Sequence, residues 1–159
     1  MEATKPIHVV GMGSPHGDDQ IGWQAIAYLQ QSSTFQQTCG NRVALYTCET
    51  PLDGFLERAK ESQTLIVIDA VVAGSVPGTI MRLTEDNLPK TCFPSSSHGY
   101  GVAQMITLGR AMNMLPSHLV VIGVEISDAK PGEPLGAWLA LAFKQLEKLV
   151  VDEIENTRV

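Results

Sequence analysis

The segment TLIVIDA, at residues 64–70, is the feature that most constrains the fold of this chain. It is rich in β-branched residues and apolar up to its single aspartate, so it has no polar face to turn towards water. Such a pattern fits a strand that is covered on both sides, as a central strand of a parallel sheet is. The segment therefore predicts a sheet with helices on both faces.

The rest of the chain alternates between strand and helix patterns. Short apolar runs predict further strands at residues 7–12, 43–46, 79–83 and 119–125. Helical spacing of apolar residues, or a proline suited to the first helical turn, predicts helices over residues 20–31, after Pro51, from 102 to about 113, and over 135–154. This alternation indicates an α/β fold. We expect residues 1–159 to form a single domain, a mainly parallel twisted sheet of about five strands with helices on both faces.

Composition argues against several classes of protein. The formal net charge is −6 and Lys and Arg are not clustered, which argues against a nucleic-acid partner. We expect no membrane partner, because no apolar run approaches the length of about 18 residues that a spanning helix needs. The N-terminus does not resemble a secretory signal, and the 3 cysteines lack CxxC spacing. We therefore expect a cytoplasmic protein, and a monomer.

Side chains able to take part in chemistry lie at three places next to predicted strands or helices. The first strand leads to Asp18 and Asp19, the central strand ends in Asp69, and His98 precedes the third predicted helix. Ligands bind beyond the carboxyl ends of parallel strands, so we expect these residues to converge. Carboxylates and an imidazole suit a divalent metal, and imidazole favours zinc, copper, iron or nickel over magnesium. Three protein ligands leave coordination positions open for catalysis or for a substrate.

Each of these residues also has a structural interpretation. Asp18 or Asp19 would cap the helix that starts near Gln20 and would oppose its dipole. Asp69 would make a structural hydrogen bond, since a buried carboxylate is costly unless it is paired or ligated. His98, taken singly, would be a solvated loop histidine. The combination favours a metal site, because one fold would bring all of these positions together.

The glycines of the first loop, Gly11 and Gly13, do not form a nucleotide-binding motif. The third glycine is Gly17 instead of residue 16, and no Lys followed by Ser or Thr comes after it. These glycines permit a tight turn and a close backbone approach. The two acids beyond them would repel a phosphate, so the loop is expected to face a cation.

Four stretches together resemble the hydrogenase maturation protease family: GMGSPHGDDQIG, IVIDAV, SSSHGYGVAQMITLGRAMNMLP and LVVIGVEI. Their order and spacing match that family from about residue 7 to about residue 150. The resemblance implies a cytoplasmic endopeptidase that removes the C-terminal extension of the large-subunit precursor of a nickel–iron hydrogenase. Cleavage would follow nickel insertion.

The same resemblance implies the roles of individual residues. Nickel would arrive with the substrate and is not expected to be stored by the isolated protease. By motif position, the residues that recognise nickel and serve catalysis are Asp19, Asp69 and His98. A cation held there would polarise the scissile carbonyl or lower the pKa of a water nucleophile, and the sequence leaves both open.

The sequence departs from the family pattern at Ser14, at Gln20 and in the stretch TCETP. Many members carry a glycine-rich stretch at the last of these places, in a loop associated with substrate choice. The sequence therefore does not indicate which hydrogenase is served. On its own chemistry, Cys48-Glu49-Thr50 is either a substrate-facing loop or an ordinary polar turn.

Two other functions stay open at this point. A metal-dependent phosphohydrolase would use Asp18, Asp19 and Asp69 around magnesium, although no Lys or Arg near these motifs would stabilise phosphate charge. A non-cleaving metallochaperone or assembly factor would bind the large subunit through Asp19, Asp69 and His98, as the protease would.

Overall fold

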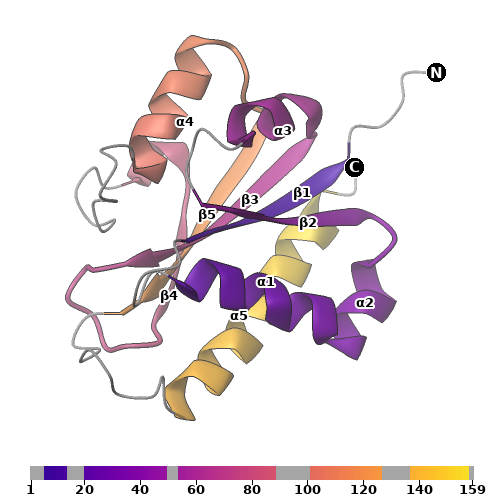
Figure 1. The fold of residues 1–159 in the computed structure, drawn as a ribbon, viewed down its shortest axis with the longest axis vertical. Coiled ribbons are helices and arrows are strands. Elements are labelled where there is room, and N and C mark those ends of the chain that lie inside the picture. The colour runs from indigo at the N-terminus through magenta and orange to yellow at the C-terminus, as the bar shows by residue number, and fades with distance from the viewer. Residues whose placement is uncertain (1–5, 14–19, 50–53, 89–100, 127–136, 158–159) are drawn as a thin grey trace.

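The protein is built on a five-stranded sheet with the strand order β2-β1-β3-β5-β4 (Figure 1). This computed structural model describes residues 6–13, 20–49, 54–88, 101–126 and 137–157. The strands are β1 (Ile7–Met12), β2 (Val43–Cys48), β3 (Thr64–Val71), β4 (Ile80–Leu83) and β5 (His118–Glu125). All neighbouring strands pair in parallel except β4, which is antiparallel to β5. The prediction of a mainly parallel sheet is confirmed.

Helices cover both faces of the sheet, which is also as predicted (Figure 1). One face, here the α1/α5 face, carries α1 (Ile21–Gln31), α2 (Ser33–Cys39) and α5 (Ala137–Asn156). The other, here the α3/α4 face, carries α3 (Phe55–Glu61) and α4 (Val102–Ala111). No helix within the described residues is long and apolar enough to cross a lipid bilayer.

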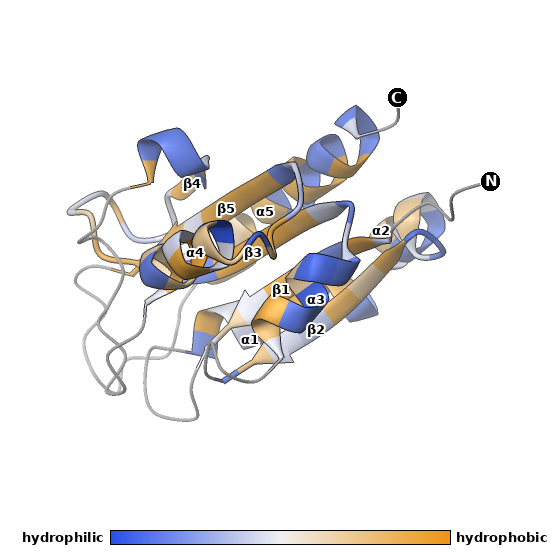
Figure 2. Ribbon diagram, turned by 90° about the horizontal axis from the view of Figure 1, so that it is seen from above, coloured by the Kyte–Doolittle hydropathy of each residue, from blue (hydrophilic) through white to orange (hydrophobic). Residues whose placement is uncertain are grey.

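Strand β3 lies at the centre of the core, as its sequence predicts. Ile66 and Ile68 pack towards the α1/α5 face, while Leu65 and Val67 pack towards the α3/α4 face, and all four are fully buried. Burial of each such side chain stabilises the fold by roughly 1.5–3 kcal/mol. Figure 2 shows hydrophobic strands between helices with hydrophilic outer sides.

All five predicted strands form, with small differences at their ends. The helices predicted from periodicity are α1, α4 and α5, and the helix predicted after Pro51 is α3, which begins at Phe55. Helix α2 was not predicted. Its N-cap is Ser32, whose hydroxyl oxygen accepts the N–H of Phe35 at 3.2 Å. A serine directly after a helix was the available signal for this second helix.

Candidate functional site

The carboxyl ends of β1, β2, β3 and β5 lie together at one edge of the sheet, here the carboxyl edge. Strands β1 and β3 are neighbours in the sheet, but the chain leaves them in opposite directions. After β1 it passes through α1 and returns to β2 on one side, and after β3 it continues to β4 on the other side. Ligands of open α/β sheets bind beyond the carboxyl ends at such a switch point. The region between the ends of β1 and β3 is therefore the candidate site.

Two glycines allow helix α1 to approach this switch point closely. A Cβ added to Gly22 would lie 2.0 Å from the Met12 carbonyl oxygen and 2.9 Å from the Ile68 carbonyl oxygen. A Cβ on Gly11 would lie 2.2 Å from the Gly22 carbonyl oxygen. The prediction that Gly11 permits a close backbone approach is confirmed, because only residues without a side chain fit here. The first turn of α1 thereby lies against the ends of β1 and β3.

Asp69 is the one predicted site residue within the described part of the chain. It lies near the end of β3, partly buried, opposite Gly123 of β5. Side chains alternate along a strand, so Asp69 continues the row of Leu65 and Val67 on the α3/α4 face. Its Oδ1 atom accepts the N–H of Ala70 at 2.8 Å. A carboxyl group therefore lies at the switch point, as the sequence predicted.

Asp18, Asp19 and His98 lie outside the described residues, so their convergence with Asp69 stays a prediction. Before Asp18 and Asp19 in the chain, Gly13 donates its N–H to the Cys48 carbonyl oxygen at 3.0 Å, at the carboxyl edge. After them, α1 has Gln20 as its N-cap. The alternative that Asp18 or Asp19 caps this helix concerns residues outside the described part of the chain and stays open.

The segment that carries His98 is followed by α4. The N-cap of this helix is Gly101, and its first residue, Val102, packs with Met12 and Val67 on the α3/α4 face. The described chain thus resumes after His98 on the same face as Asp69. Within the described residues, no group of three or more His, Cys, Asp or Glu side chains is placed to hold a metal ion.

Cys48 lies in β2, so the two interpretations of Cys48-Glu49-Thr50, a substrate-facing loop or a polar turn, now concern Glu49 and Thr50 and stay open. Cys48 is the last residue of β2 and is buried. Its carbonyl oxygen accepts the Gly13 N–H at 3.0 Å and the Trp23 indole N–H at 3.1 Å, so it holds the first loop and α1. Glu49 is exposed, and Thr50 lies outside the described residues.

Sequence reasoning missed Glu125, the last residue of β5. It is fully buried and pairs with Val71, two positions beyond the pairing of Asp69 with Gly123. Alternation along β5 places its side chain on the α3/α4 face, as for Asp69. The signal was the same as for Asp69: a carboxylate at the end of an otherwise apolar strand.

The sequence matches the family model of hydrogenase maturation proteases, HycI, over residues 28–153. This range includes the positions of Asp69 and His98 and begins after Asp19. The chain is also 29% identical over 132 residues to the hydrogenase expression/formation protein HupD of Thiocapsa roseopersicina, covering 79% of this chain and 56% of HupD. For HupD of Rhodobacter capsulatus the identity is 29% over 140 residues, covering 80% and 63%. The chain thus spans 56% to 63% of the length of these curated relatives.

A solved structure has a similar fold. The hydrogenase maturating endopeptidase HybD of Escherichia coli superposes with a TM-score of 0.69, covering 96% of this chain and 94% of that one. The two sequences are 22% identical, so the likeness shows a shared fold.

Proposed function

This chain belongs to the hydrogenase maturation protease family, and on that premise we propose that it is an endopeptidase. Its substrate is the large-subunit precursor of a nickel–iron hydrogenase, from which it removes the C-terminal extension after nickel insertion. The family match supports this proposal, as do relatives that are named for hydrogenase expression and formation. We further propose that it acts in the cytoplasm as a monomer.

The observation that carries the proposal is Asp69, a partly buried carboxyl group at the switch point of the sheet in a member of this family. Asp69, with Asp19 and His98, is proposed to bind the nickel that the precursor carries. Two carboxylates and an imidazole accept nickel without the tight retention that thiolates would give. The metal therefore leaves with the substrate.

The chemical step is hydrolysis of one peptide bond. Water adds to the scissile carbonyl carbon, the carbon–nitrogen bond breaks, and the released amine takes a proton. The substrate's nickel either polarises that carbonyl or lowers the pKa of the attacking water. The role of the protease is to orient the precursor so that the precursor's metal and its scissile bond lie at the carboxyl edge.

Single substitutions test this assignment. We expect Asp19→Ala, Asp69→Ala and His98→Ala each to slow cleavage of a nickel-loaded precursor by roughly 100-fold or more, the loss typical of removing one electrostatic catalytic group. The mass of the precursor before and after incubation measures cleavage. Asp86→Ala is the matched control, because Asp86 is an exposed carboxylate outside the site, and its variant should cleave at the wild-type rate.

Normal processing by all three site variants would contradict the assignment. If the wild-type protein forms a complex with the precursor but leaves its mass unchanged, the protein is a non-cleaving assembly factor. Cleavage of phosphate esters that does not depend on His98 would instead indicate a phosphohydrolase.

A further inference from the structure

The side chain of Glu125 binds the first residues of the segment that follows β3. Both carboxylate oxygens lie 3.0 Å from the backbone nitrogen of Ala73, and Oε1 also accepts the N–H of Gly74 at 3.1 Å. The side chain has no exposed surface. Burying a carboxyl group is costly, and these backbone donors offset that cost.

The main chain of the same residue binds the other end of that segment. The Glu125 carbonyl oxygen accepts the N–H of Gly78 at 2.9 Å, and the Glu125 N–H donates to the Thr79 carbonyl oxygen at 2.9 Å. Residues 72–79, here the β3–β4 loop, are therefore fastened at both ends to one residue of β5.

Further contacts fix the path of the β3–β4 loop between those ends. Gly74 and Gly78 have φ angles of 83° and 89°, in the left-handed region that glycine adopts readily. A Cβ on Gly78 would lie 2.9 Å from the Trp138 ring of α5, so the loop packs closely on that helix. The Val76 carbonyl oxygen accepts both the N–H and the hydroxyl of Thr79, at 3.0 and 2.6 Å. The loop is thus held in one conformation.

This fixed loop follows directly on the strand that carries Asp69, and it displays two apolar side chains to solvent. Val72 is 49% exposed and Val76 is 76% exposed. Val72 comes three residues after Asp69, and since a strand rises about 3.3 Å per residue, their Cα atoms are separated by about 10 Å at most. A single exposed valine is ordinary. Two valines on a loop that a buried carboxylate fixes next to the proposed catalytic aspartate need a further reason.

We infer that Glu125 is a positioning residue, which holds the β3–β4 loop so that Val72 and Val76 contact the precursor polypeptide next to the scissile bond. The inference rests on the proposed function, because the precursor is the substrate that would lie across the carboxyl edge. An extended peptide also rises about 3.3 Å per residue, so Val72 meets an apolar side chain within about three residues of the cleaved bond, and Val76 contacts the same polypeptide farther along the loop. Glu125 itself does not touch the substrate.

The test compares four variants with the wild-type protein. Val76→Asp places a charge on the loop, Glu125→Gln removes one of the two acceptor oxygens, and the third variant combines both changes. Met112→Asp is the matched control, because Met112 is 55% exposed at the other end of α4 from the carboxyl edge. The readouts are kcat and KM for cleavage of the nickel-loaded precursor and hydrogen exchange of the Ala73 and Gly74 amides.

We expect KM to rise about tenfold in Val76→Asp and in Glu125→Gln with kcat nearly unchanged, the size typical of one apolar contact. The double variant should show no further rise, since Glu125 acts through the valines. Glu125→Gln should exchange the two loop amides faster and leave those of β3 unchanged. Met112→Asp should match the wild type.

An unchanged KM in Val76→Asp, or unchanged amide exchange in Glu125→Gln, would overturn the inference. If the wild-type protein still cleaves the precursor in that case, the proposed function stands. If the wild-type protein does not cleave, the proposed function fails. In that case the dissociation constant of the complex with the intact precursor is measured for each variant. The inference holds if Val76→Asp, Glu125→Gln and the double variant bind the precursor about tenfold more weakly than the wild type, and it fails if Val76→Asp binds as tightly as the wild type.

Discussion

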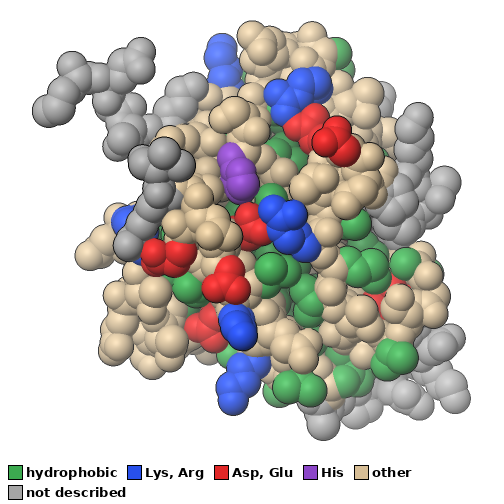
Figure 3. All heavy atoms as spheres, turned by 180° about the vertical axis from the view of Figure 1, so that it is seen from behind, with side chains coloured by type: hydrophobic (Ala, Val, Ile, Leu, Met, Phe, Trp, Pro, Cys, Tyr) green, Lys and Arg blue, Asp and Glu red, His purple; other side chains and the backbone are tan. Residues whose placement is uncertain are grey.

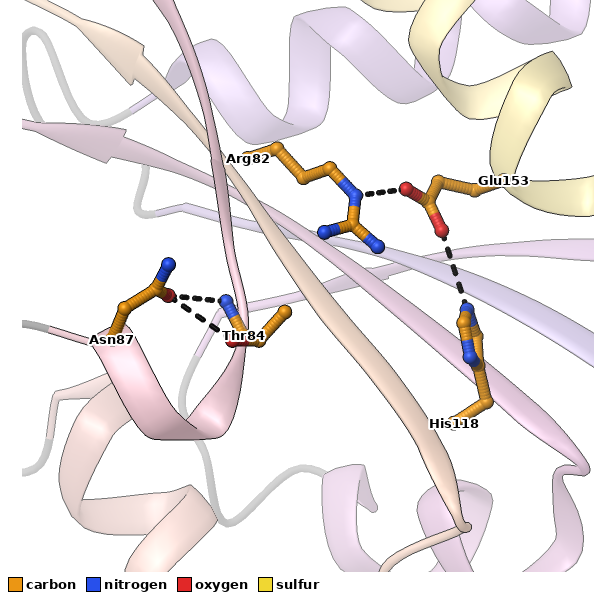
Figure 4. Close-up of polar contacts among 5 residues, drawn as sticks. All are labelled: Arg82, Thr84, Asn87, His118 and Glu153. Atoms are coloured by element: carbon orange, nitrogen blue, oxygen red, sulfur yellow. Dashed lines mark hydrogen bonds and ion pairs between the residues drawn. The ribbon is translucent and has the colours of Figure 1, made fainter. Parts of the chain in front are cut away.

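Glu125 and Glu153 are both buried carboxylates on or beside β5, but they have different partners. Glu125, at the carboxyl edge, accepts backbone N–H groups of one loop. Glu153, on α5, accepts the Nε–H of Arg82 on β4 and lies 3.2 Å from Nε2 of His118, the first residue of β5 (Figure 4). Burial raises the pKa of the Glu153 carboxyl group, and the bonds to Arg82 and His118 outweigh this and leave the pKa below its usual value.

The different partners of Glu125 and Glu153 indicate two structural roles for a buried carboxylate. Side-chain partners on two strands, β4 and β5, fasten a helix to the sheet, and the strength of these contacts depends on the protonation of the carboxylate. Backbone partners from consecutive residues fix the shape of one loop. Figure 3 shows oppositely charged side chains next to one another near the middle of one face of the molecule, and hydrophobic side chains gathered on its lower part. We therefore expect changes at Glu153 to affect stability alone and changes at Glu125 to affect substrate binding as well.

The largest effect on stability is expected from Arg82→Met. This change leaves the buried Glu153 carboxylate with His118 as its side-chain partner among the described residues, and it should lower the free energy of unfolding by roughly 2–3 kcal/mol. Chemical denaturation measures the loss. Arg110→Met is the control, since Arg110 pairs with Glu85 in a solvent-exposed bridge worth about 0–1 kcal/mol.

A double substitution sharpens this prediction. In Arg82→Met combined with Glu153→Leu the unpaired charge is gone, so much of the lost stability should return. KM and kcat for the precursor should stay at wild-type values in both variants. A rise in KM would contradict the distinction between the two carboxylates.

A smaller loss of stability is expected from Glu125→Ala, about 1–2 kcal/mol. The Ala73 and Gly74 N–H groups lose their acceptor, but an exposed loop is able to shift so that water replaces it. Asp152→Ala, an exposed carboxylate on α5, is the control and should be close to neutral. Stability equal to the wild type in Glu125→Ala would show that the carboxylate does not hold the loop.

The dependence of stability on acid distinguishes Glu153 further. Its pKa is lower in the folded protein than in the unfolded chain, so it stabilises the fold above the unfolded value of about 4.3. That stabilisation is lost as pH falls through the folded pKa. Denaturation from about pH 6 to about pH 3 should give a flatter acid limb in Glu153→Gln than in the wild type. An equally steep limb would contradict the pairing.

The smallest effect is expected at His8, in the amino half of β1. Burial lowers the pKa of this histidine; the charge of Glu61 and a hydrogen bond to the Arg58 backbone, both on α3, oppose the shift, and the Arg58 charge adds to it. Its ring packs edge-on against Tyr46 at 5.1 Å, and its Nδ1 atom has no hydrogen-bond partner among the described residues. The unfolded chain therefore takes up a proton below about pH 6.5 more readily than the folded protein.

Stability should accordingly fall slightly as pH drops below about 6.5, in a window above that of Glu153. His8→Phe keeps an aromatic ring against Tyr46 and should remove this part of the pH dependence. The same slope in the variant and the wild type between about pH 6.5 and about pH 5 would show that His8 is not its source.

Much of the fold could be predicted because burial and element type are local properties of the sequence. The run at residues 64–70 is apolar on both faces up to Asp69, and this local pattern by itself indicates a central strand. The antiparallel pairing of β4 was not predictable from its short run at 80–83, since pairing direction depends on the connection and on the partner strand.

The sequence by itself determined that Asp69 lies near the end of a buried strand, and hence that a carboxyl group lies where parallel sheets bind ligands. Only the tertiary structure decided which groups Glu125 and Glu153 bind. Their partners are far away along the chain: Ala73 lies 52 residues from Glu125, and Arg82 lies 71 residues from Glu153. A local pattern specifies which atoms are buried, but strand order and register specify which distant donors reach them.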